Sequence, residues 1–212
     1  MCETERSKND PQRTRQQSNH QRTRERGKRG LPSPLGHFTV AYGLSKSTKT
    51  FSLPGLIVGS IMPDLNILIT YVTRGMVGRE ALHSIVGAGT LGTFLATFVV
   101  VLVYPVAVST IVGLKREDMR AVCRPSAKLV ASAFVGGLSH ILVDATCHPY
   151  NPLFYPFTRQ SIDVLLFTSD WGHAYLLVEL LLIGLLGTFL FQLRRKGAPH
   201  IWRELLVGTS AR

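Results

Sequence analysis

Apolar residues are distributed very unevenly along this chain of 212 residues. Residues 1–30 contain only Met1 and Cys2 from the apolar set, whereas residues 84–114 include no charged residue at all. An uncharged run of that length exceeds the roughly 20 residues that an α-helix needs to cross a bilayer. The pattern therefore excludes a simple soluble globular domain and predicts membrane-spanning helices.

The apolar segments predict an all-α integral membrane bundle. We expect three to four spanning helices plus a short helical hairpin, formed by residues 36–45 and 52–63. Pro63 predicts the end of the second hairpin helix, but apolar residues follow it, so one broken span over 52–73 is the alternative. The other predicted helices comprise residues 83–104, 129–146 and 173–193.

Composition divides the chain into three parts. Residues 1–34 are polar and basic and lack apolar periodicity, so we expect a disordered basic tail. This tail has no apolar stretch of the kind found in a cleaved signal peptide. Residues 35–196 hold the predicted helices and the candidate metal site, and residues 197–212 are expected to form a short polar C-terminal tail.

The distribution of basic residues predicts how a membrane protein is oriented in the bilayer. Basic residues are in excess in this chain, whose net charge is +11. If residues 52–73 span the bilayer and 36–45 does not, one side carries 21 basic residues and the other three, and the richer side is cytoplasmic. If the hairpin crosses instead, the division is 12 and 12. We predict three full spans and a half-depth hairpin, with the N-terminal tail on the side of the candidate site. Nucleic acid is expected as a partner only through that tail, for which a solvated arm is the favoured role.

A few ionisable residues interrupt the apolar segments. Asp64 is the only charge within 51–73, and Asp144 is the only charge within 129–158. Charged groups inside apolar helices are costly and are functional candidates by default. Because successive helices alternate in direction, the same end of the bundle should also gather His37, His83, His140, His148 and His173.

The spacing of His140 and Asp144 places both side chains on one face of a helix, one turn apart. Imidazole and carboxylate groups from several elements are the ligands that zinc and similar divalent ions take, and a cation would supply the counter-charge that two buried carboxylates need. We predict a divalent metal ion, zinc before others, with the ligands His37, Asp64, His83, His140 and Asp144. The candidate catalytic residues are Asp64, His140 and Asp144, and one carboxylate could instead act as general base.

Structural roles are the favoured interpretation of several other residues. We expect interfacial positions for His148 and His173, and a bundle-facing hydrogen bond for Glu179. Close helix contacts are expected at Gly87, Gly89, Gly92, Gly136 and Gly137. No CxxC pair is present, so structural or incidental roles are expected for Cys2, Cys123 and Cys147.

Several segments resemble the YdjM-like family, namely GHFTVAYG, GSIMPDLN, LHSIVG and GGLSHILVDATCHPYNPLFYPF. Members of that family are described as LexA-binding, inner-membrane-associated metal-dependent hydrolases. The resemblance covers about residues 36–193, and its most specific part is the SHxxxDxxT block at 139–146 followed by PLFYPF at 152–157. It places the polar positions of the family on the same five predicted ligands. Gly78 stands where similar proteins often carry a histidine.

Three functions fit these observations. The leading hypothesis is a protein of the cell or inner membrane that hydrolyses a lipid or lipid-linked ester or phosphoester with a metal ion. The second is a transport or ion-binding protein, which needs a polar path through the bundle that only Glu179, Thr93 and Thr97 could continue. The third is a non-catalytic membrane adaptor whose basic tail binds a partner or DNA.

Overall fold

The structure is a computed structural model that describes residues 34–74, 79, 81–148, 150–162, 170–195 and 201–208. These residues form helices and turns and include no strand. The disorder predicted for residues 1–34 falls almost wholly outside this description. Residues 33–212 make up one compact unit.

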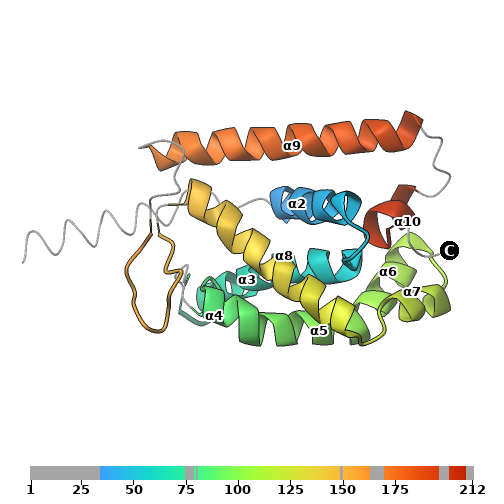
Figure 1. Ribbon diagram of the computed structural model, residues 1–212, viewed down its shortest axis with the longest axis horizontal. Helices are drawn as coiled ribbons and strands as arrows, with labels where there is room; N and C mark the ends of the chain where they lie inside the picture. The colour runs from blue at the N-terminus through green and yellow to red at the C-terminus, as the bar shows by residue number, and fades with distance from the viewer. Residues whose placement is uncertain are drawn as a thin grey trace, which may run out of the picture. The chain divides into compact units, whose positions relative to one another are not determined.

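The helices confirm the all-α prediction (Figure 1). In chain order they are α2 (Pro34–Ser47), α3 (Leu53–Arg74), α4 (Ile85–Gly87), the π-helical turn η1 (Ala88–Gly92), α5 (Thr93–Leu102), α6 (Tyr104–Val112), α7 (Arg116–Val122), α8 (Ala127–Cys147), α9 (Trp171–Arg195) and α10 (Ile201–Leu206). Four segments of the described chain are long and apolar enough to cross a membrane: Leu53–Thr73, Ile85–Leu102, Ala127–Cys147 and Trp171–Arg195. The short helix α2 would extend only about 21 Å, less than the hydrocarbon thickness.

Helix α3 differs from the half-depth hairpin helix predicted over 52–63. It continues through Pro63 to Arg74 without interruption and is long enough to span a bilayer. Proline removes one backbone hydrogen bond, but helices packed in a membrane tolerate this loss because neighbouring elements hold them in place. The prediction that α3 ends at Pro63 is therefore wrong, and the alternative of one long segment holds.

Small residues bring α3 and α8 together in the most extensive helix pair of the fold. A Cβ atom added to Gly59 would lie 2.2 Å from the carbonyl oxygen of Ala133, and one added to Gly136 would lie 2.4 Å from that of Leu56. No side chain fits at either position, so the two backbones touch, as small residues allow in membrane bundles. The close contact predicted for Gly136 is confirmed, and this crossing places Ser60 of α3 beside α8.

The predicted helix over 83–104 consists of three consecutive segments. It begins with α4, passes through the π-helical turn η1 and continues as α5. The hydroxyl of Thr93 donates a hydrogen bond to the carbonyl of Ala88, five residues earlier, at 2.8 Å. This bond matches the wider register of a π-turn, which occurs often at functional sites. The helix breaks at Val103, just before Pro105.

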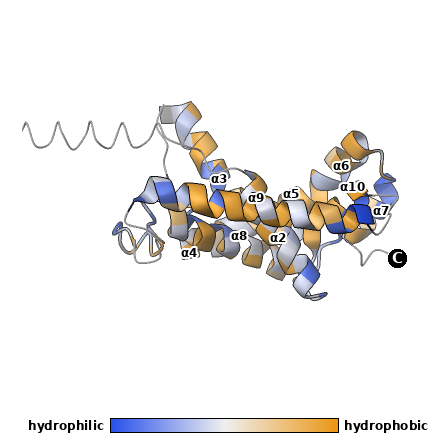
Figure 2. Cartoon of the chain, turned by 90° about the horizontal axis from the view of Figure 1, so that it is seen from above, coloured by the Kyte–Doolittle hydropathy of each residue, from blue (hydrophilic) through white to orange (hydrophobic). Residues whose placement is uncertain are grey.

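Helix α9 presents most of its apolar surface outward. It packs against α2 and α8 through the buried residues Ala174, Val178 and Leu193. Many of its other large apolar side chains are exposed, among them Leu176, Leu177, Leu180, Leu181 and Ile183. The hydropathy view shows how apolar this helix is (Figure 2). An exposed apolar face of this length contacts lipid in a membrane protein.

Two short helices occupy segments for which the sequence predicts a loop and a polar tail. Met119 of α7 and Leu205 of α10 are buried. The hydroxyl of Tyr104 donates a hydrogen bond to the carbonyl of Leu206 at 2.8 Å, which ties α10 to α6. Cys123 is buried beside Met119, and burial raises the pKa of its thiol to about 11. The structural role predicted for Cys123 fits this position.

Candidate metal centre

The structure brings all five predicted ligands together at one end of the bundle, where α8 ends and α9 begins (Figure 1). They come from α2, from α3, from the turn before α4 and from the last turns of α8: His37, Asp64, His83, His140 and Asp144. Four of them are buried, and the side chain of Asp64 is 21% exposed. The cluster is therefore accessible to solvent on the side of Asp64.

Two imidazole nitrogens each lie close to the same two carboxylate oxygens in this cluster. The Nε2 atom of His83 lies 3.8 Å from Oδ1 of Asp64 and 3.7 Å from Oδ2 of Asp144. The Nε2 atom of His140 lies 3.6 Å and 3.3 Å from the same two oxygens. All these separations exceed the usual hydrogen-bond range of about 2.7–3.2 Å, so the carboxylates and imidazoles face one another without a hydrogen bond.

The same separations suit ligands that share an ion. Two atoms bound tetrahedrally to zinc at about 2.0–2.1 Å lie roughly 3.3 Å apart. Three of the converging atoms are buried and have no hydrogen-bond partner among the described residues: Oδ1 of Asp64, Nε2 of His83 and Nε2 of His140. Buried polar atoms without partners are rare in folded proteins and require an explanation. The two-histidine, two-carboxylate set fits a divalent cation.

A backbone carbonyl determines which ring nitrogen of His140 carries a proton. Its Nδ1 lies 2.6 Å from the carbonyl oxygen of Ser60 on α3. Because a carbonyl can only accept, Nδ1 carries a proton and donates it, and Nε2 is the atom directed at Asp64 and Asp144. A backbone partner of this kind orients metal-binding histidines and fixes their tautomer. The tight crossing of α3 and α8 thus orients the ring of His140.

Arg79 is a charged neighbour of the cluster that the sequence did not assign to the site. Its Nη1 donates a hydrogen bond to Oδ2 of Asp144 at 2.9 Å, and its side chain is largely buried. From the sequence, Arg79 is only one of three basic residues expected at this end of the bundle. Because basic residues are scarce at this end, an arginine here is a candidate ion-pair partner for the two buried acids. This was the signal in the sequence that could have indicated its role.

His37 and His148 face the second oxygen of Asp144. The distance to Oδ1 is 3.4 Å from Nε2 of His37 and 3.7 Å from Nε2 of His148. The ring of His37 also stacks on that of His140, with centroids 3.8 Å apart. The interfacial position predicted for His148 is wrong, because its residue is only 6% exposed and lies inside the cluster. Its place at the end of α8, one turn after Asp144, explains the burial.

The other candidate residues lie either next to the cluster or outside it. His173 is exposed, 78% by side chain, and its ring contacts Asp170, so it stays outside the cluster as predicted. Sγ of Cys147 lies within 4.8 Å of ligand atoms of Asp144 and His148 and contacts the carbonyl of Val143 at 3.4 Å. Among the described residues no hydrogen-bond partner reaches Oε1 of Glu179, whereas a bundle-facing hydrogen bond was predicted.

The position of Asp64 along its helix corrects another expectation. The sequence placed Asp64 at a helix end, whereas α3 continues ten residues beyond it to Arg74, about 15 Å at 1.5 Å per residue. Leu68, Tyr71 and Val72 in this extension are exposed. The cluster therefore lies next to an apolar surface that extends past it.

Burial favours the neutral form of two cluster histidines that lie outside the spanning segments, His83 and His148. It lowers the pKa of His83 and lowers that of His148 to about 4. Removal of an imidazolium from water is unfavourable, so both rings are neutral at neutral pH. Neutral imidazole is the form that binds metal ions.

The model of the YdjM inner membrane protein family matches residues 34–209 of the chain. The chain belongs to this family. As a member of the YdjM inner membrane protein family with four segments long enough to cross a bilayer, it is an integral membrane protein. No curated protein and no solved structure matches the chain with significant similarity. The family match includes every residue of the cluster and excludes most of the basic N-terminal tail.

Proposed function

We propose that this YdjM family member is a membrane-embedded, metal-dependent hydrolase that acts on a lipid or lipid-linked ester or phosphoester. The observation that carries the proposal is the convergence of imidazole and carboxylate atoms at 3.3–3.8 Å, several of them buried without a hydrogen-bond partner among the described residues. Zinc suits this donor set best, since it takes histidine nitrogen and carboxylate oxygen in tetrahedral sites.

The residues of the cluster have different roles in this proposed reaction. Asp64, His83, His140 and Asp144 would hold the ion, because both histidines contact both carboxylates. A bound divalent ion supplies a nucleophilic water at neutral pH and polarises the ester or phosphoryl oxygen. Asp64 is the ligand with access to solvent, so it is also the candidate general base that accepts the proton of the attacking water. The carbonyl of Ser60 orients His140.

A lipid substrate is supported by what surrounds the open side of the cluster. The second half of α3 extends past Asp64 with exposed apolar side chains, among them Leu68 and Val72. Such a surface contacts hydrocarbon in a bilayer. A lipid that lies along α3 could therefore present its polar head to Asp64 without leaving the membrane.

Arg79 favours a phosphoester among the ester classes. Its guanidinium lies against Asp144, so one basic group faces the same carboxylate as the proposed ion. Arginine presents a planar fork of donors that matches the oxygens of a phosphate. A phosphoryl group bound between the ion and Arg79 would have its negative charge compensated from two sides.

The transport alternative requires a polar path that leaves the cluster toward the far end of the bundle. The hydroxyls that could continue this path are engaged within their own helix, because Thr93 donates to the carbonyl of Ala88 and Thr97 to that of Thr93. Glu179 is then the remaining polar side chain that the sequence offered for such a path. This arrangement favours a site that opens on one side only.

Hydrolysis by the purified chain tests the proposal. The full chain, loaded with Zn²⁺, is placed in vesicles of zwitterionic and anionic phospholipids, and release of fatty acid and of phosphate-bearing head group is followed. We expect hydrolysis that chelation abolishes and that Asp64→Asn slows by about 10²–10⁴-fold, the range for loss of a general base.

His173→Ala is the matched control, because that histidine is exposed and outside the cluster. It should leave the rate unchanged. Equal rates for the wild-type protein and Asp64→Asn would contradict the proposed role of the cluster. Ion flux through the vesicles without lipid hydrolysis, lost in Asp64→Asn, would favour the transport alternative.

A further inference from the structure

We propose that the cluster contains a second cation site, built by His37, His148 and Oδ1 of Asp144, so that the Asp144 carboxylate bridges two ions. This inference rests on the metal-dependent function proposed above and adds to it a ligand, His148, and a second ion. Two ions bridged by a carboxylate lie about 3.5–4 Å apart in hydrolytic sites, where they bind both oxygens of a displacement reaction.

The two oxygens of Asp144 face different sets of nitrogen atoms. Oδ2 faces His83 and His140, the histidines of the first site. Oδ1 instead faces Nε2 of His37 at 3.4 Å and Nε2 of His148 at 3.7 Å. Both separations are too long for a good hydrogen bond and close to the roughly 3.3 Å expected of two ligands on one tetrahedral ion.

Two of the three atoms of this second set, those of Asp144 and His148, are buried and lack hydrogen bonds among the described residues. Asp144 is 2% exposed and His148 is 6% exposed. Within the described part of the chain, neither Oδ1 of Asp144 nor Nε2 of His148 has a hydrogen-bond partner. A cation bound between them would satisfy both the unpartnered carboxylate oxygen and the unpartnered imidazole nitrogen, which face each other in a buried region.

Three contacts hold His148 in place for this role. Its backbone N–H donates to the carbonyl of Asp144 at 2.8 Å, which continues α8 by one residue. Its own carbonyl accepts a bond of 2.6 Å from the buried side chain of Asn151. Its ring packs against Tyr175 of α9, with centroids 5.8 Å apart. The ring is thus positioned by three separate elements, as a ligand requires.

Glu179 places a carboxyl group beside the segment of α2 that carries His37. It lies in the middle of the apolar helix α9, and a Cβ atom on Gly36 would come within 3.2 Å of its Oε2. Gly36 immediately precedes His37, so the carboxylate of Glu179 lies beside the segment that carries this ligand. Its Oε1 is buried and has no hydrogen-bond partner among the described residues. A second cation nearby accounts for an acid that would otherwise be costly in a spanning helix.

Metal content at equilibrium tests the second site. The full chain is purified in detergent, stripped with a chelator and dialysed against excess Zn²⁺, and bound zinc is measured by mass spectrometry for the wild-type protein, His148→Ala and His173→Ala. We expect about two ions per chain for the wild-type protein and for His173→Ala, and about one for His148→Ala, which keeps the first site.

A second measurement needs no substitution. When Mn²⁺ replaces Zn²⁺, two ions bridged by one carboxylate are magnetically coupled, whereas a single ion shows the hyperfine pattern of isolated Mn²⁺. We expect the electron paramagnetic resonance spectrum of the wild-type protein to change from the isolated to the coupled form as loading passes one ion per chain.

The outcomes separate this inference from the proposed function. A wild-type chain that saturates at one ion, with the isolated Mn²⁺ spectrum and no change in His148→Ala, would overturn the second site and leave the proposed function intact. A wild-type chain that binds no ion at all would overturn both. Loss of one of two ions in His148→Ala, with the first retained, supports the second site.

Discussion

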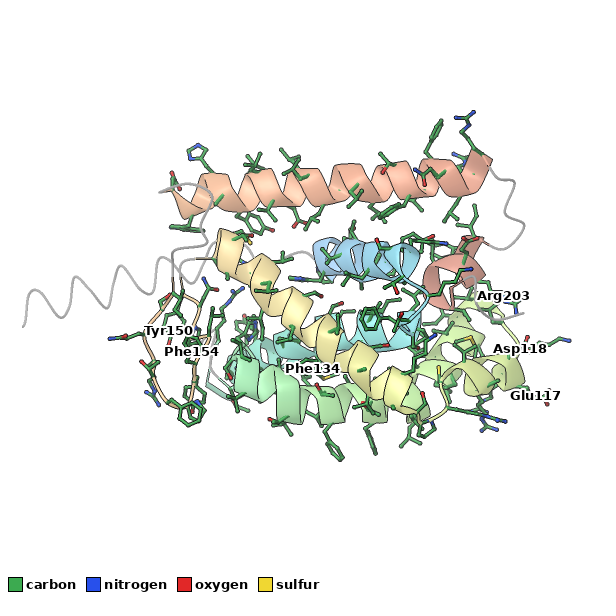
Figure 3. All side chains as sticks on the ribbon, in the orientation of Figure 1. Glu117, Asp118, Phe134, Tyr150, Phe154 and Arg203 are labelled. Carbon is green, nitrogen blue, oxygen red and sulfur yellow. The ribbon has the colours of Figure 1, made fainter. Side chains whose placement is uncertain are left out.

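The two ends of the bundle carry charge in opposite ways. At the end with the metal centre, Asp144 is buried and Asp64 is largely so, and both are surrounded by histidines. At the other end the charges are exposed: Lys46, Lys49, Arg116, Glu117, Asp118 and Arg120. Figure 3 shows Tyr150 and Phe154 at the first end and Glu117, Asp118 and Arg203 at the second. Exposed charges are solvated, and basic ones among them determine how the protein is oriented in the membrane. Buried charges need a specific partner.

The largest expected effect is an all-or-none difference in accessibility between these ends. Single cysteines are introduced at positions 20, 120 and 160 in a chain without Cys2, Cys123 and Cys147, and a membrane-impermeant reagent is applied from each side. Because α2 begins beside the metal centre, we expect positions 20 and 160 to react from the same side and position 120 from the other.

Labelling of positions 20 and 120 from one side would contradict this arrangement, and His37 would then have to leave the ligand set. Position 160 lies in the turn-rich segment at the end with the metal centre, and position 120 lies in α7 at the other end. Their comparison therefore determines which end of the bundle faces the cytoplasm.

The crossing of α3 and α8 supports the buried charges at the first end, so filling it should damage both stability and metal binding. Gly136→Leu places atoms where a Cβ would already lie 2.4 Å from a backbone oxygen. We expect a loss of about 3 kcal/mol or more in the free energy of unfolding, measured in detergent by thermal or denaturant unfolding. Gly184→Leu is the matched control, since no atom lies within 4 Å of a Cβ there. Equal losses at both positions would contradict the role of the crossing.

Arg79 tests whether the buried carboxylate of Asp144 needs its guanidinium partner. Arg79→Ala removes the bond of 2.9 Å to Oδ2 and should lower the affinity for Zn²⁺ by about 10–100-fold, the usual cost of losing a partner of a ligand. Competition with a zinc chelator measures this affinity. Arg159→Ala, at an exposed position at the same end, should change it little. An unchanged affinity in Arg79→Ala would show that Asp144 is held by the ion and histidines alone.

The smallest effect is expected at the exposed end. Lys46 pairs with Glu204 there, and both side chains are partly exposed. A pair in contact with solvent contributes less than about 1 kcal/mol. Lys46→Ala should therefore change the unfolding midpoint slightly and leave metal content unchanged. A loss in the free energy of unfolding as large as that of Gly136→Leu would contradict the difference between the two ends.

The convergence of the ligands could be predicted from the sequence because it follows from local spacing and helix direction. His140 and Asp144 share a helical face by their spacing of four residues. Asp64 and His83 reach them because consecutive spans alternate in direction. The close packing at Gly136 was also predictable, since small residues mark helix contacts in membranes.

The rest depends on contacts that no local pattern contains. Pro63 stops helices in water, but here α3 continues because α8 packs against it closely. The position of the His148 side chain depends on a hydrogen bond from Asn151, in a turn, and on a ring contact with Tyr175, in another helix. Arg79 lies in an irregular segment before His83, where sequence periodicity carries no information about side-chain direction.

Elemental analysis of the detergent-purified chain tests the central claim most directly. The wild-type protein should retain at least about one divalent metal ion per chain, and a variant that combines His140→Ala with Asp144→Ala should hold none, because two ligands of the same ion are lost. Retention of a stoichiometric ion by this double variant, or a wild-type chain that binds no metal even when Zn²⁺ is supplied, would contradict the account.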